Sequence, residues 1–143
     1  MSAINTATPV VPTVSRSRAV LVLVLGIAIA VLANWIIATT ALAAGASGAF
    51  SPLMIYVYGP FTVLGLLAGY LGWCIVRRRS RRPAAMLRVL VPVITVLSFA
   101  PDTILVLTRF IPGTSVAAVT ALALMHLVVV AIAVPISARL APV

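Results

Sequence analysis

The sequence has very few of the residues on which catalysis and metal binding depend. Its 143 residues include no lysine, one acid (Asp102), one histidine (His126) and one cysteine (Cys74). A single cysteine excludes an internal disulfide, a paired-cysteine redox site and a four-thiolate metal site. One acid leaves no second carboxylate for acid–base catalysis, and one histidine cannot supply the three protein ligands of a usual catalytic metal site. We therefore expect no enzymatic activity, no cofactor and no metal.

Charge of either sign is scarce as well. Only 8% of the residues are charged, whereas 64% are hydrophobic. A soluble domain carries roughly 25% charged residues, so this chain cannot cover itself with a water-facing surface. The ten arginines border long apolar runs, where the preference for positive charge on the cytoplasmic side explains them without nucleic acid. The composition predicts an all-α integral membrane protein with lipid as its main partner and no nucleic-acid partner.

The apolar runs predict four membrane-spanning helices. No charge occurs between residues 19 and 76, far more than the roughly 20 residues of one crossing. Glycine, serine and proline between residues 44 and 52 divide this run in two. A proline–glycine turn near residue 112 separates two further spans. The predicted spans are residues 19–41, 53–76, 89–108 and 116–136, and the third is the weakest because it contains Asp102 and two prolines.

The distribution of arginine predicts the orientation of these spans. Nine arginines fall on one side of the predicted bundle, and only Arg109 falls on the other. The positive-inside rule then places both termini in the cytoplasm, in an up-down-up-down four-transmembrane-helix bundle. Residues 1–18 and 140–143 are predicted to be cytoplasmic tails, the first of them disordered, with the transmembrane domain at 19–139. A cleaved signal peptide within residues 1–43 is the alternative for the first span, although its apolar run is long for one.

Small residues mark the faces on which helices can approach each other closely. Lipid offers no hydrophobic reward for helix association, so such faces carry much of the packing. We expect the face of the first span to pack on the face of the second within one chain, with a homodimer as the alternative. The residues concerned are Gly26, Ala30 and Ala33 in the first span and Gly65, Gly69 and Gly72 in the second.

Asp102 is the residue that most suggests a function, because an ionisable group inside a span is costly. Three partners are available to it. Arg109 lies seven residues later on nearly the same helix face, and His126 lies at a similar depth on the other side of the turn. Asn34, with the threonines at 39 and 40, lies at a comparable depth in the first span. The site is either a polar clasp that sets helix packing or a proton- or cation-handling site.

Arginines also cluster between the second and third spans. Arg77, Arg78, Arg79, Arg81 and Arg82 are expected to contact anionic lipid headgroups, each contributing about 1 kcal/mol. Membrane topology alone accounts for the same residues.

The last third of the chain resembles a known family. The stretch from Ala121 to Val128, followed by Val134-Pro135 and Arg139, is similar to small four-span membrane proteins of high-GC actinobacteria, a family of unknown function. Pro101-Asp102 in the third span is similar too. The resemblance implies a four-helix membrane fold, an uncharacterised role and no catalytic residues.

Two functions remain open at this point. The first is a non-enzymatic accessory or scaffold protein of the bacterial cell membrane, packing with copies of itself or within a larger membrane complex. The second is a minimal transporter or a component of a proton or ion pathway, centred on Asp102 and His126. The pattern of the small multidrug transporters does not fit, because the first span carries no acid.

Overall fold

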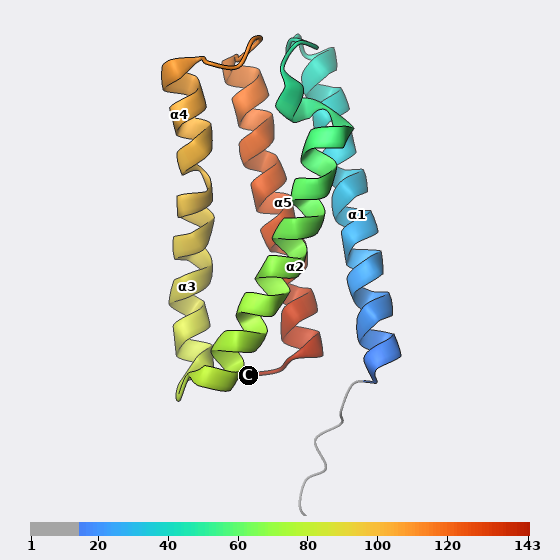
Figure 1. Cartoon of the computed structure of the whole chain (residues 1–143), viewed down its shortest axis with the longest axis vertical. Coiled ribbons are helices and arrows are strands. Elements are labelled where there is room, and N and C mark those ends of the chain that lie inside the picture. The colour runs from blue at the N-terminus through green and yellow to red at the C-terminus, as the bar shows by residue number, and fades with distance from the viewer. Residues whose placement is uncertain (1–14) are drawn as a thin grey trace, which may run out of the picture.

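The protein is a bundle of long helices, seen in a computed structural model that describes residues 15–143 (Figure 1). The helices are α1 (Arg16–Ala43), α2 (Ile55–Arg79), α3 (Pro83–Ser98), α4 (Ala100–Thr108) and α5 (Val116–Leu140), with a short 3-10 turn at Ser51–Leu53. Within residues 15–143 there is no strand. Counting α3 and α4 as one span, four helices in this part of the chain are long and apolar enough to cross a membrane.

At the arginine-rich end of the bundle each span extends beyond its predicted limit. With 28 residues, α1 is about 42 Å long, more than the roughly 30 Å of a hydrocarbon core. It begins at Arg16, after an N-cap in which the Ser15 hydroxyl accepts from the Arg18 amide. Arg16 and Arg18 therefore lie in the first helix rather than in a tail, and residues 1–14 of the predicted tail lie outside the described residues. Likewise α5 continues to Leu140, and Ala141 after it is buried.

The third span is interrupted at Phe99, where α3 ends and α4 begins. Pro101 has no amide hydrogen, so it cannot donate to the carbonyl four residues earlier. Nearby hydroxyls bond to the main chain: Thr95 donates to the Val91 carbonyl and Ser98 to the Thr95 carbonyl. The break places Asp102 in the first turn of α4, which a reading of one continuous span does not predict.

Two glycines with left-handed backbone shape the loops at the arginine-poor end. Gly45, with φ +95°, follows α1 in a Schellman arrangement, in which the Ala46 amide donates to the Ala41 carbonyl. Gly113, with φ +78°, lies in the α4–α5 turn and packs against Ser47 and the Phe50 amide. The α1–α2 and α4–α5 connections therefore contact each other.

The centre of the bundle is α5, which contributes side chains to all three buried clusters of the described chain. Alanines at 118, 121 and 133 are buried there, and small side chains let neighbouring backbones approach closely. The α3–α4 span is the least buried of the four: 11% of its most apolar stretch is buried, whereas the value for α5 is 28%. Figure 1 shows it at one side of the bundle, next to α5.

The small-residue faces of the first two spans pack mainly on α5, which corrects the expectation that they pack on each other. A Cβ added at Gly26 would meet the Ile136 side chain, and one at Gly69 would meet Ala133. Gly65 faces Val129, Gly72 has open space beside it and Ala33 is half-buried. Only Ala30 lies in a cluster shared by α1, α2 and α5. Because lipid is as apolar as the helices, the shape of the packing surfaces decides which helices are neighbours. The small alanine side chains of α5 allow both faces to pack closely against it.

Candidate functional site

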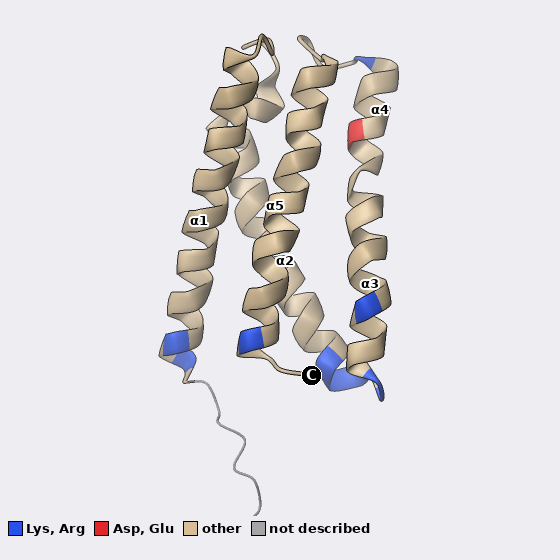
Figure 2. Ribbon diagram, turned by 180° about the vertical axis from the view of Figure 1, so that it is seen from behind, with Lys and Arg blue, Asp and Glu red and all other residues tan. Residues whose placement is uncertain are grey.

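Asp102 lies in the first turn of α4 and faces α5, where its carboxylate contacts His126. Figure 2 shows acidic colour on α4. Its side chain is buried, with 4% of the residue exposed. The Asp102 Oδ2 atom lies 3.4 Å from Nδ1 of His126 on α5. Of the three partners considered from sequence, the structure brings His126 to Asp102, because the turn at Gly113 returns the chain antiparallel at the same depth.

The contact between the two side chains leaves the carboxylate short of hydrogen bonds. Nδ1 of His126 lies 2.9 Å from the Leu122 carbonyl, one turn earlier on its own helix. A single Nδ1 proton is donated most directly to this nearer oxygen, so Oδ2 of Asp102 receives at best a shared, longer contact. Within the described residues Oδ2 is enclosed and has no hydrogen-bond partner. Its burial costs free energy that the His126 contact offsets only in part.

An aromatic ring and a small pocket complete this site. The Phe99 ring, at the break between α3 and α4, meets the His126 imidazole edge-on with centroids 6.1 Å apart. Asp102 lines a pocket of about 330 Å³ between α4 and α5. Its other walls are mostly apolar, formed by Phe99, Thr103, Val106, Leu107, Val119, Thr120 and Ala123. The site therefore combines one carboxylate, one half-exposed imidazole and an apolar hollow.

Comparison with known families gives one match. A model of a family of unknown function, DUF6069, matches residues 12–142. The chain belongs to this family. No curated protein and no solved structure matches the chain. The match reaches far beyond the last third, on which the resemblance from sequence rested, and its description names no activity. The actinobacterial origin expected from that resemblance stays a prediction.

The other two partners considered for Asp102 lie elsewhere. Arg109 ends α4 in a left-handed conformation with φ 49° and is exposed, and the ion contact of Asp102 in the described chain is with His126. Asn34 instead donates from Nδ2 to the Thr62 hydroxyl of α2 at 2.8 Å. The hydroxyls of residues 39 and 40 donate to carbonyls of their own helix. These side chains do not extend the Asp102 site.

Sequence reasoning missed two polar contacts that join helices. The hydroxyl of the buried Thr62 accepts a hydrogen bond from Asn34 and donates one to the Tyr58 carbonyl. It therefore connects the Asn34 side chain to the main chain of α2. At the arginine-rich end, Nε1 of Trp73 donates to the Ala141 carbonyl at 2.9 Å. A polar residue within the second span was the available signal for Thr62. No sequence signal connected Trp73 to a main-chain carbonyl 68 residues away.

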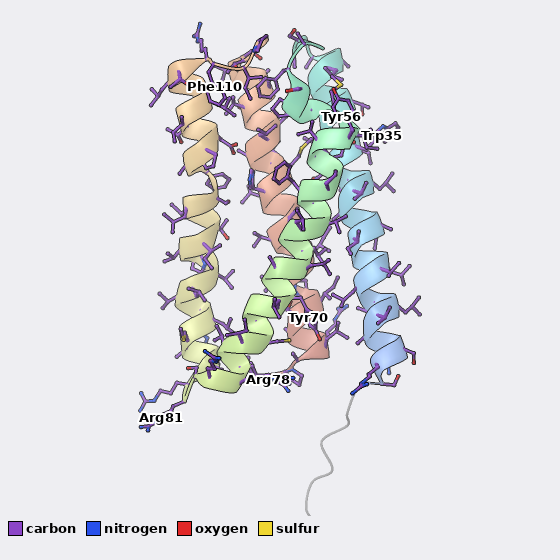
Figure 3. The ribbon with its side chains drawn as sticks, viewed as in Figure 1. Trp35, Tyr56, Tyr70, Arg78, Arg81 and Phe110 are labelled. Carbon is purple, nitrogen blue, oxygen red and sulfur yellow. The ribbon has the colours of Figure 1, made fainter. Side chains whose placement is uncertain are left out.

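The five clustered arginines occupy the end of α2 and the loop to α3, and all are exposed. Figure 3 shows Arg78 and Arg81 at this end of the bundle, far from Tyr56 and Phe110 at the other. Their contact with lipid headgroups stays a prediction. Among residues 15–143 no three His, Cys, Asp or Glu side chains come close enough together to hold a metal ion.

Proposed function

We propose that this chain is a non-enzymatic, multi-pass protein of the bacterial cell membrane that serves as an accessory or scaffold component. The supporting observation is the placement of its contacts between helices. The Asn34–Thr62 bond joins α1 to α2, the Trp73 indole joins α2 to the end of α5, and the Asp102–His126 contact joins α4 to α5. Each polar contact ties two neighbouring helices, which fits packing better than a polar path across the membrane.

The first test is the native mass of the particle, extracted directly into lipid nanodiscs. An accessory role predicts co-purification with other membrane proteins in a defined ratio, or a closed homo-oligomer. A monodisperse monomer at all protein concentrations would contradict the proposal. Extraction with a harsh detergent, run in parallel, should dissociate the assembly, because lateral helix contacts in lipid are individually weak.

In the proposed orientation both termini and the arginine cluster lie in the cytoplasm. Figure 2 supports it: most of the basic positions gather at one end of the bundle. Arg109 follows the last turn of α4, at the other end. In lipid such asymmetry sets orientation. Cysteine labelling tests it, since replacing Cys74 with alanine leaves a cysteine-free background.

Two positions make a matched pair for that labelling. A Cβ at Gly48, in the α1–α2 connection, meets nothing within 4 Å, so Gly48→Cys should be tolerated. Ser80 lies in the loop between α2 and α3. In intact cells a membrane-impermeant maleimide should label Gly48→Cys and spare Ser80→Cys until the membrane is broken. The reverse pattern would invert the proposed orientation.

The second candidate function is a component of a proton or ion pathway. The observation that favours it is the enclosed Oδ2 of Asp102, which has no hydrogen-bond partner. The test is proton and cation flux in liposomes with the native chain, Asp102→Asn and, as a control in another polar contact, Thr62→Val. A pathway requires flux that Asp102→Asn abolishes and Thr62→Val preserves. Equal flux in all three, or none in the native chain, would exclude it.

A further inference from the structure

One oxygen of the Asp102 carboxyl group, Oδ2, is enclosed and receives no hydrogen bond in the described chain. Its ion contact is with Nδ1 of His126 at 3.4 Å, while the Leu122 carbonyl lies closer to the same nitrogen, at 2.9 Å. The Nδ1 atom of His126 donates to this nearer carbonyl rather than to the carboxylate. A buried charge is costly unless it is paired and hydrogen-bonded. Within the described residues the site therefore lacks a hydrogen-bond donor for Oδ2.

No arginine of the described chain supplies that group. Arg109, the nearest in sequence, caps α4 and is exposed. The other nine lie toward the opposite end of the bundle (Figure 2). The donor that completes the site therefore lies outside residues 15–143.

The pocket beside Asp102 has the size and walls to receive such a group. Its volume of about 330 Å³ falls at the lower end of the range for small-molecule sites, roughly 300–1,000 Å³. Phe99, Val106, Leu107, Val119 and Ala123 make most of its surface apolar. One buried carboxylate in an apolar hollow is a usual composition for a site that orients a ligand through a single polar group.

The residues that line the pocket also indicate which class of cation it can bind. A hard metal ion such as Ca²⁺ takes six to eight oxygen ligands. The pocket offers one carboxylate and the hydroxyls of Thr103 and Thr120, fewer oxygen ligands than such an ion takes. An organic cation needs far fewer ligands, and an aromatic ring such as that of Phe99 attracts it.

We propose that the pocket between α4 and α5 binds a small organic ammonium ion, with its charged nitrogen at Asp102 and its apolar body against Phe99 and Val106. Occupancy places a hydrogen-bond donor and a positive charge beside the carboxylate. This binding function goes beyond the scaffold role and does not rest on it. The pocket faces the bilayer, so a ligand that partitions into lipid reaches it from the side.

The test uses tritiated benzyldimethylammonium and the full chain in lipid nanodiscs, with binding followed by scintillation proximity. The proposal predicts saturable binding that empty nanodiscs lack. Isobutylbenzene, which has the same shape without the charge, should compete at least tenfold more weakly than unlabelled probe. Binding that never saturates, or equal competition by the uncharged compound, would overturn the proposal.

Two variants separate the charge from the cavity. Asp102→Asn should weaken binding at least tenfold, and Ala123→Leu should do so by filling the pocket while Asp102 stays in place. Thr62→Val, in a polar contact outside the pocket, is the control and should bind as the native chain does. Unchanged binding in Ala123→Leu would overturn the proposal even if Asp102→Asn fails to fold. The native mass of the Ala123→Leu particle should equal that of the native chain, which keeps this result separate from the scaffold test.

Discussion

Replacing Gly113 with alanine should destabilise the protein by about 2–5 kcal/mol, because this residue combines a left-handed backbone with a contact between two loops. Its φ is +78°, and an added Cβ would lie 2.8 Å from the Ser47 Cβ and 3.0 Å from the Phe50 amide nitrogen. Carbon atoms in favourable contact lie about 3.5–4.0 Å apart. One of these neighbours is main chain, so the clash cannot be relieved by turning a side chain alone.

The magnitude follows from two parts that the chain itself lets us separate. A left-handed conformation costs an alanine roughly 1–2 kcal/mol, and overpacking costs roughly 1–3 kcal/mol. Gly45→Ala should carry the cost of the left-handed conformation without the cost of overpacking, since the φ of Gly45 is +95° and nothing lies within 4 Å of an added Cβ. Gly48→Ala should carry neither cost, because Gly48 has no positive φ and open space beside it. Gly45→Ala should therefore cost about 1 kcal/mol, and Gly48→Ala less than about 0.5 kcal/mol.

The assay is reversible unfolding in mixed micelles, with increasing mole fraction of sodium dodecyl sulfate, followed by tryptophan fluorescence. Trp73 is buried and hydrogen-bonded, so its emission should report the loss of tertiary packing. The order of stability should be Gly48→Ala, then Gly45→Ala, then Gly113→Ala. If Gly113→Ala and Gly45→Ala cost the same, the contact between the loops carries no free energy and the reasoning fails.

The two contacts that sequence reasoning missed give further predictions in the same assay. Thr62→Val removes the acceptor of Asn34 Nδ2 and leaves that buried amide unpaired, so it should cost about 1–2 kcal/mol, whereas Thr62→Ser should cost less because it keeps the hydroxyl. Equal losses in the two variants would assign the effect to the lost methyl packing instead. Trp73→Phe deprives the Ala141 carbonyl of its donor and should cost about 1 kcal/mol. Because this variant lacks the fluorescent reporter, its unfolding is followed by circular dichroism instead. Hydrogen exchange should then rise in the last turn of α5, and unchanged exchange there would show that the indole does not hold this end.

The fold was largely predictable because membrane insertion depends on local composition. Four helices long and apolar enough to span are found in the described chain. The helix interruption at Phe99 was harder to predict, although Pro101 indicated its approximate position. The site was predictable only as alternatives: Asp102 had three candidate partners, and their spacing along the chain could not choose among them. The pocket beside it could not be predicted, since it depends on how side chains from α4 and α5 meet.

The sequence by itself determined that the protein is helical, which segments can span a membrane and where positive charge gathers. These properties depend on the free energy of transfer from water to lipid, which each segment's own length and composition largely determine. Only the tertiary structure decided that α5 lies at the centre, that Asn34 pairs with Thr62, and that His126 rather than Arg109 contacts Asp102. Lipid is as apolar as a leucine side chain, so hydrophobicity does not choose the neighbour of a helix. The choice falls to shape and to a few hydrogen bonds, which exist only once the helices are side by side.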